Sequence, residues 1–119
     1  MKSILLVDDS TSIRNIVKGS LVRDYLVVEA DHGQAALDLL AKGITIDLFL
    51  LDVNMPVMDG LTLLKQIKTD PRFAKTPVLM LTTETKQERR QEAKALGAAG
   101  WILKPCDPET LLVALKSLF

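Results

Sequence analysis

Four short apolar runs along the chain each end at a polar residue. The runs are residues 3–7, 46–51, 78–81 and 101–103, and residues 26–29 form a fifth strand-like segment. Continuous apolar runs of this length are typical of strands buried on both faces of a parallel sheet. Helix-like stretches alternate with these runs along the whole chain. The pattern therefore predicts an α/β fold in which helices cover both faces of a parallel sheet.

The first three helix-like stretches show an apolar stripe at helical spacing. Ser10 or Thr11 is the expected N-cap of the first helix, and Gly43 is the expected residue after the second. The inward-facing residues predicted for the three helices, in order, are Ile13, Ile16, Val17 and Leu21; Ala36, Leu37 and Leu40; and Leu61, Leu64 and Ile67.

The last two helices are predicted to differ in polarity. The fourth, over residues 86–96, is mostly charged, which is typical of a solvated face. The fifth begins at Asp107, followed by proline at the first helical position. It has more apolar residues than one buried stripe requires, so Leu112, Val113 and Phe119 are expected to lie exposed on a partner or dimer surface. The alternative is wider burial against the first helix or the sheet edge.

The polar residues that end the strands are expected to meet at one edge of the sheet. Right-handed crossovers leave few ways to assemble five such units, and the flavodoxin-like strand order 2-1-3-4-5 is a common one. Ligands of open parallel sheets bind outside the carboxyl ends of the strands. There, Asp8 and Asp9 follow the first strand and Asp52 the third, while Thr82 and Lys104 follow the fourth and fifth.

This combination of side chains favours phosphoryl-transfer chemistry. Neighbouring carboxylates repel one another unless a cation is present, and an all-oxygen set favours a hard ion, Mg²⁺ above all. Asp52 is a competent nucleophile that can form an acyl phosphate. Lys104 could neutralise a phosphoryl oxygen, and the hydroxyl of Thr82 could donate a hydrogen bond to another.

Composition narrows the class of protein. The 119 residues have the size of one domain, 1–119, and 48% of them are hydrophobic. Fifteen basic and fifteen acidic residues give no net charge, which argues against nucleic acid or a membrane as partner. A single cysteine, Cys106, fits a reducing compartment, and no segment is long enough for a signal peptide or a membrane span. We therefore expect a cytoplasmic protein.

The ordered set of motifs resembles the receiver domain of two-component response regulators. The matching residues are Asp8-Asp9, Asp52-x-x-Met55-Pro56-x-Met58-Asp59-Gly60, Thr82, and Gly100-Trp101-x-x-Lys104-Pro105. Each motif alone is common, but the set in this order and spacing is specific and spans nearly the whole chain. Because the chain ends after the fifth helix, it is similar to the stand-alone receivers of chemotaxis.

The resemblance implies a role for each matching residue. Asp52 would be the phosphoacceptor, and Asp9 and Asp52 would ligate Mg²⁺ directly. Asp8 would act mainly through bound water, and the backbone carbonyl of Asn54 would complete the protein ligands. Lys104 would bridge the phosphoryl group and the carboxylates. A cis peptide bond is also implied between Lys104 and the following proline.

The same resemblance implies a signalling switch rather than a dedicated enzyme. A sensor histidine kinase, in chemotaxis the chemotaxis kinase, would donate the phosphoryl group. Thr82 and Trp101 would then reshape the face formed by helix four, strand five and helix five, where a flagellar motor switch or a phosphatase would bind. Asn54 and Thr83 would tune the lifetime of the phosphoryl group. The protein is expected to be a monomer or weak dimer.

Two departures from the family pattern and several alternatives remain. Residues 21–25 form a shorter connection than usual, and Cys106 replaces a common aromatic residue. The chain could instead serve a phosphorelay or stress pathway, or bind partners without phosphorylation. A phosphatase of the haloacid-dehalogenase type would need an acidic residue where Asn54 stands, and a flavin carrier would need a different loop after strand one. Trp101 and Cys106 could be packing residues only, and His32 is expected outside the site.

Overall fold

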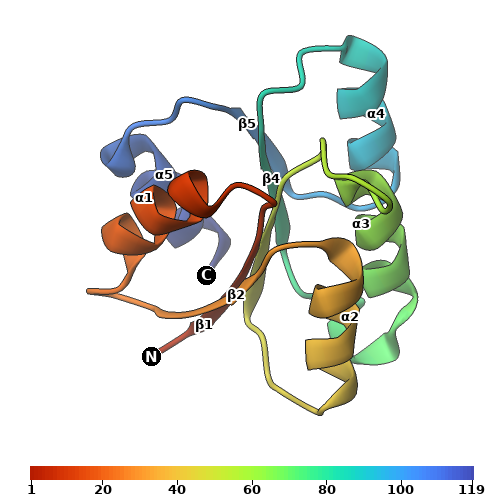
Figure 1. Ribbon diagram of the computed structural model, residues 1–119, viewed down its shortest axis with the longest axis horizontal. Coiled ribbons are helices and arrows are strands. Elements are labelled where there is room, and N and C mark those ends of the chain that lie inside the picture. The colour runs from red at the N-terminus through yellow and green to blue at the C-terminus, as the bar shows by residue number, and fades with distance from the viewer.

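The computed structural model describes all residues from 1 to 119 and contains one five-stranded parallel sheet (Figure 1). The strand order, β2-β1-β3-β4-β5, confirms the predicted flavodoxin-like topology. The strands are β1 (Ser3–Val7), β2 (Leu26–Ala30), β3 (Leu48–Leu51), β4 (Val78–Thr82) and β5 (Gly100–Leu103). The helices are α1 (Thr11–Leu21), α2 (Gly33–Ala41), α3 (Gly60–Thr69), α4 (Gln87–Ala95) and α5 (Pro108–Leu118), with a short 3₁₀ helix, η1 (Pro71–Phe73).

Helices cover both faces of the sheet, with α1 and α5 on one side and α2, α3 and α4 on the other (Figure 1). Successive residues of the central strands point to opposite faces: Leu5 belongs to the apolar core under α2–α4, and Leu6 belongs to the core under α1 and α5. Both are at most 2% exposed. This double burial explains why the central strands are uninterrupted apolar runs in the sequence.

The register of the strands aligns their carboxyl ends. Val7 pairs with Ala30 on one side and with Leu51 on the other. The backbone N–H of Asp52 then donates to the carbonyl of Val7 at 2.9 Å. Asp8 and Asp52 therefore leave adjacent strands at the same level, as the strand pattern predicted.

Side-chain burial departs from the prediction in the helices. Ile16 was expected in the apolar stripe of α1 but is 66% exposed, because it lies about 100° around the helix from the buried Val17. In α5, Val113 is exposed as expected, whereas Leu112 is half-buried. Phe119 is 40% exposed, and its ring packs on that of Tyr25 at 5.3 Å between centroids. Wider burial thus accounts for part of the apolar surplus.

Element ends follow the expected capping chemistry in most places. Ser10 caps α1 by accepting from the backbone N–H of Ile13, and Gly43 follows α2 with a φ of +85°. Helix α4 is one residue shorter at each end than predicted, and β3 begins at Leu48 although Ile46 is buried. No helix is both long and apolar enough to cross a membrane.

Candidate functional site

Three carboxylates meet at the carboxyl edge of the sheet. Asp8 and Asp9 follow β1 and Asp52 follows β3, and one oxygen from each lies within 4.8 Å of the others. Asp8 and Asp52 are 2% and 6% exposed, whereas Asp9 is open to solvent. They line a depression of about 430 Å³. Its other lining residues are Ser10, Ile13, Asn54, Thr83, Lys104 and Pro105.

Lys104 brings a positive charge to this cluster. Its backbone N–H donates to the carbonyl of Thr82, which places it just beyond the end of β5, beside the end of β4. Its Nζ lies 2.5 Å from Oδ2 of Asp8 and 3.6 Å from Oδ2 of Asp52. The Lys104–Pro105 peptide bond is cis, as the family resemblance implied. One lysine against three carboxylates leaves an excess of negative charge that favours a cation.

One carboxylate oxygen of Asp52 lacks a hydrogen-bond partner. Its Oδ1 is buried and has no hydrogen-bond partner. The pKa of Asp52 is raised overall, mainly because the carboxyl group is buried, and the negative charge of Asp8 raises it further. The ammonium of Lys104 and weaker contacts with Thr82 and the Asn54 backbone lower this pKa but do not cancel the effect of burial. Buried oxygens without a partner are rare in folded proteins. An oxygen-binding cation or a phosphoryl group at this position would satisfy it.

Thr82 lies at the end of β4 and is fully buried. Its Oγ1 accepts a hydrogen bond from the backbone N–H of Glu84 at 3.1 Å. That contact uses the hydroxyl as an acceptor, so its hydrogen stays available for donation. Thr83 and Asn54 are exposed and line the depression, where they can contact an incoming group.

Three residues considered from the sequence lie outside the carboxylate cluster. Trp101 is half-buried and packs on the core under α2–α4, beside a hollow lined in part by Arg90 and Lys94. His32 caps α2 by accepting from the backbone N–H of Ala35 through Nδ1. Burial raises the pKa of the Cys106 thiol, which keeps it in the unreactive protonated form.

Features of the loop between β3 and α3 were not predicted from the sequence. Gly60 lies against the backbone of Asp52, and a Cβ added there would be 1.9 Å from the Asp52 carbonyl oxygen. The Asp-Gly pair at 59–60 was a signal for a turn but not for this contact. Val57 has a φ of +69° and a fully exposed side chain, and no sequence signal announced that conformation.

Comparison with known proteins decides the family. A family model described as the response regulator receiver domain matches residues 4–116. The chain belongs to the response regulator receiver family. It is therefore a receiver of two-component signalling, a class of signalling proteins rather than dedicated enzymes. Receivers generally bind Mg²⁺ at an acidic pocket, and in this chain Asp8, Asp9 and Asp52 form an acidic cluster.

Several relatives of this receiver are named as chemotaxis proteins. The chemotaxis protein CheY-3 of Vibrio cholerae is 44% identical over 119 residues, which cover 98% of this chain and 90% of that protein. The chemotaxis protein CheY of Pseudomonas aeruginosa is 38% identical, with coverages of 98% and 94%. The crystallised CheY4 of Vibrio cholerae superimposes with a TM-score of 0.93 at 45% identity and covers 100% of this chain and 99% of that one.

Proposed function

We propose that residues 1–119 act as one phosphorylation-activated switch in which Asp52 accepts a phosphoryl group from a histidine kinase. The observation that carries this proposal is the buried, unpartnered Oδ1 of Asp52. It belongs to a carboxylate that lines an open depression together with Lys104 and two further aspartates. A nucleophilic oxygen without a partner is free to form a new bond, and the nearby ammonium of Lys104 can neutralise part of the negative charge of the incoming phosphoryl group.

The donor set fits a magnesium ion. All candidate ligands are oxygens, two of the three carboxylates are buried, and their oxygens lie close enough together to share one ion. Asp9 and Asp52 would bind it directly, Asp8 mainly through water, and the backbone carbonyl of Asn54 would complete the protein ligands. When bound, the ion neutralises charge on the carboxylates and on the phosphoryl oxygens.

The transfer itself requires little covalent work from the protein. An oxygen of Asp52 forms a bond to phosphorus while the phosphorus–nitrogen bond of a phosphohistidine breaks. The imidazole nitrogen keeps the electron pair of that bond and can take up a proton from solvent. Lys104, already 3.6 Å from Asp52, pairs with a phosphoryl oxygen. Later attack by water returns the carboxylate and releases inorganic phosphate, at a rate that Asn54 and Thr83 influence.

The signal would leave the site through Thr82 and Trp101. Thr82 donates its hydroxyl hydrogen to the phosphoryl group, and Trp101 responds on the neighbouring strand β5. Phosphorylation then favours one of two pre-existing arrangements of the face formed by α4, β5 and α5. Chemotaxis is the favoured pathway because the similar relatives are named for it. A chemotaxis kinase and a flagellar motor switch or phosphatase would be the partners, in the cytoplasm.

Activation with a phosphate analogue tests this proposal. The chain is incubated with Mg²⁺ and either acetyl phosphate or beryllofluoride, and Trp101 fluorescence and intact mass are followed. We expect a mass increase of one phosphoryl group with acetyl phosphate and a fluorescence change with either reagent. Asp52→Asn is the matched control and should show neither. A wild-type chain that is neither modified nor changed in fluorescence would refute the proposal.

A further inference from the structure

Every polar group of Asp8 has a partner within the chain. Its backbone N–H donates to the carbonyl of Ala30 at 3.2 Å, and its Oδ1 accepts from the backbone N–H of Ser10 at 2.9 Å. Its Oδ2 accepts from Lys104, and its carbonyl oxygen accepts from Nη1 of Arg14 at 2.5 Å. By contrast, the side chain of Asp9 makes no hydrogen bond or ion pair and is exposed. The two neighbouring aspartates are therefore positioned in different ways.

The contact from Arg14 acts on the peptide unit that joins the two aspartates. The carbonyl of Asp8 lies in the same plane as the N–H of Asp9, because the peptide bond is planar. Fixing that carbonyl fixes the orientation of the plane and the direction in which Asp9 leaves it. Asp9 has no other side-chain contact to set its position. Arg14 is thus the side chain best placed to determine where the Asp9 carboxylate lies.

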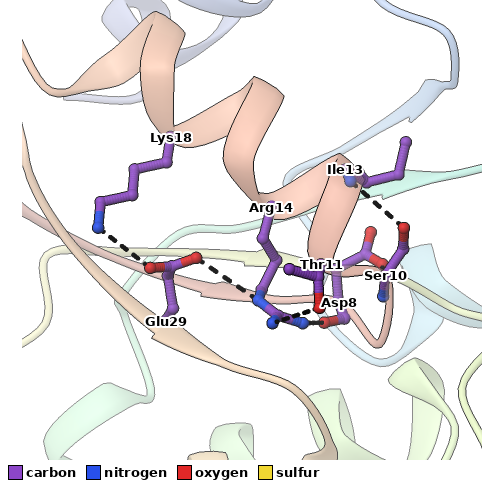
Figure 2. A network of polar contacts seen from close by, with 7 residues as sticks. All are labelled: Asp8, Ser10, Thr11, Ile13, Arg14, Lys18 and Glu29. Atoms are coloured by element: carbon purple, nitrogen blue, oxygen red, sulfur yellow. Dashed lines mark hydrogen bonds and ion pairs between the residues drawn. The ribbon is translucent and has the colours of Figure 1, made fainter.

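The guanidinium of Arg14 is itself held from three directions (Figure 2). Besides the carbonyl of Asp8, it contacts Thr11 Oγ1 at 3.3 Å, and its Nε lies 3.5 Å from Oε1 of Glu29 on β2. Glu29 also pairs with Lys18 at 3.1 Å. The side chain of Arg14 is 14% exposed, compared with 44% for Lys18. A half-buried, planar guanidinium with several partners loses little further freedom and holds a fixed geometry.

We propose that Arg14 is a positioning residue for the divalent cation site, acting through the Asp8–Asp9 peptide. This inference rests on the proposed function, which places Asp9 among the ligands of Mg²⁺. Glu29 would serve the same end by orienting the guanidinium and offsetting its charge. Interactions that orient metal ligands are commonly worth about tenfold or more in metal affinity.

Charge and positioning make opposite predictions for Arg14. A positive charge near three carboxylates opposes the binding of a cation, so removing it should by itself tighten Mg²⁺ binding. Loss of positioning should weaken it. Arg14→Lys keeps the charge and removes the planar fork, so its effect reports positioning alone. Arg14→Gln removes both and shows which of the two effects is larger.

Titration of the ¹⁵N-labelled chain with magnesium chloride, followed by NMR at constant ionic strength, measures the affinity. We expect Arg14→Lys to weaken Mg²⁺ binding about tenfold and Arg14→Gln to weaken it as well. Lys18→Met is the matched control, because it removes the other partner of Glu29 without a contact to the loop, and should stay within about twofold of wild type. Urea unfolding without Mg²⁺ identifies any variant that is merely unstable.

The outcomes separate the two proposals. Unchanged or tighter Mg²⁺ binding in Arg14→Lys overturns the positioning role while leaving the proposed function intact. Equal weakening in the Lys18→Met control also overturns it, because the effect would then not depend on the contact between Arg14 and the Asp8 carbonyl. If Arg14→Gln does not fold, the more conservative Arg14→Lys decides. A wild-type chain that does not bind Mg²⁺ overturns the proposed function and this inference with it.

Discussion

Gly60 offers a direct test of how the backbone places Asp52, the proposed phosphoacceptor. This residue begins α3, and its N–H donates to the carbonyl of Val53 at 2.8 Å. An alanine Cβ at this position would lie 1.9 Å from the carbonyl oxygen of Asp52, 2.8 Å from its carbonyl carbon and 2.9 Å from Cα of Val53. All three atoms belong to the backbone, so no side-chain rotation can relieve the contact.

The size of the effect follows from this geometry. Carbon–oxygen contacts in proteins lie near 3.3 Å, so Gly60→Ala leaves a shortfall of about 1.4 Å that the Asp52 backbone or the start of α3 must absorb. Overpacking of this kind costs about 1–3 kcal/mol of unfolding free energy. A displacement of about 1 Å at a reacting group can cost about 100-fold in rate. We therefore expect Gly60→Ala to be less stable and much slower to phosphorylate.

Two measurements and one control decide the question. Urea unfolding gives the stability, and the rate of phosphorylation by acetyl phosphate gives the reactivity. Gly19→Ala is the matched control, because nothing lies within 4 Å of its added Cβ on the exposed side of α1. It should gain about 0.5–1 kcal/mol from the higher helix propensity of alanine. If Gly60→Ala matched wild type in both stability and rate, this account of the loop would be wrong.

Three further predictions concern other residues of the same region. Val57→Asn should raise the unfolding free energy by about 1 kcal/mol, because asparagine tolerates the positive φ at this exposed position better than a β-branched residue; an unchanged urea midpoint would contradict this. Asp52→Asn should raise the unfolding free energy of the metal-free protein at pH 7, because the raised pKa of Asp52 means that ionisation of this buried carboxyl opposes folding. The gain should shrink as the pH falls towards about 4, and a gain that does not depend on pH would contradict this explanation. Arg89→Ala should cost about 0.5 kcal/mol by removing ion pairs to Asp59 at 3.2 Å and Glu84 at 3.8 Å, and the loss should diminish in high salt when unfolding is compared at two ionic strengths.

The sheet and the edge at which the site lies could be predicted from the sequence, because burial selects the residues of each strand locally. Residues such as Leu5 and Leu50 belong to strands buried on both faces, so burial alone selects an uninterrupted apolar run, and the polar residue that follows marks the strand end. The positions of Asp8 and Asp52 at one edge then follow from the parallel arrangement. Ordered motifs also sufficed to identify the family, because they combine several weak signals at compatible spacing.

Other features depend on contacts between segments far apart in the chain. Lys104 lies 96 residues from Asp8, and only the packing of β5 beside β4 brings its ammonium to that carboxylate. The burial of the α1 stripe depends on what covers each side of the helix, so Ile16 was predicted wrongly. Nothing local distinguishes Arg14 from a solvated arginine until Glu29 on β2 lies next to it.

The sequence pattern therefore determined which residues end the strands, because a buried strand requires apolar residues along its whole length and the first polar residue marks its end. Tertiary structure decided how those residues are held. The unpartnered oxygen of Asp52, the close approach of Gly60 and the fixed peptide between Asp8 and Asp9 all arise where separate segments meet. Those contacts depend on distances between elements, and periodicity along one chain does not encode such distances.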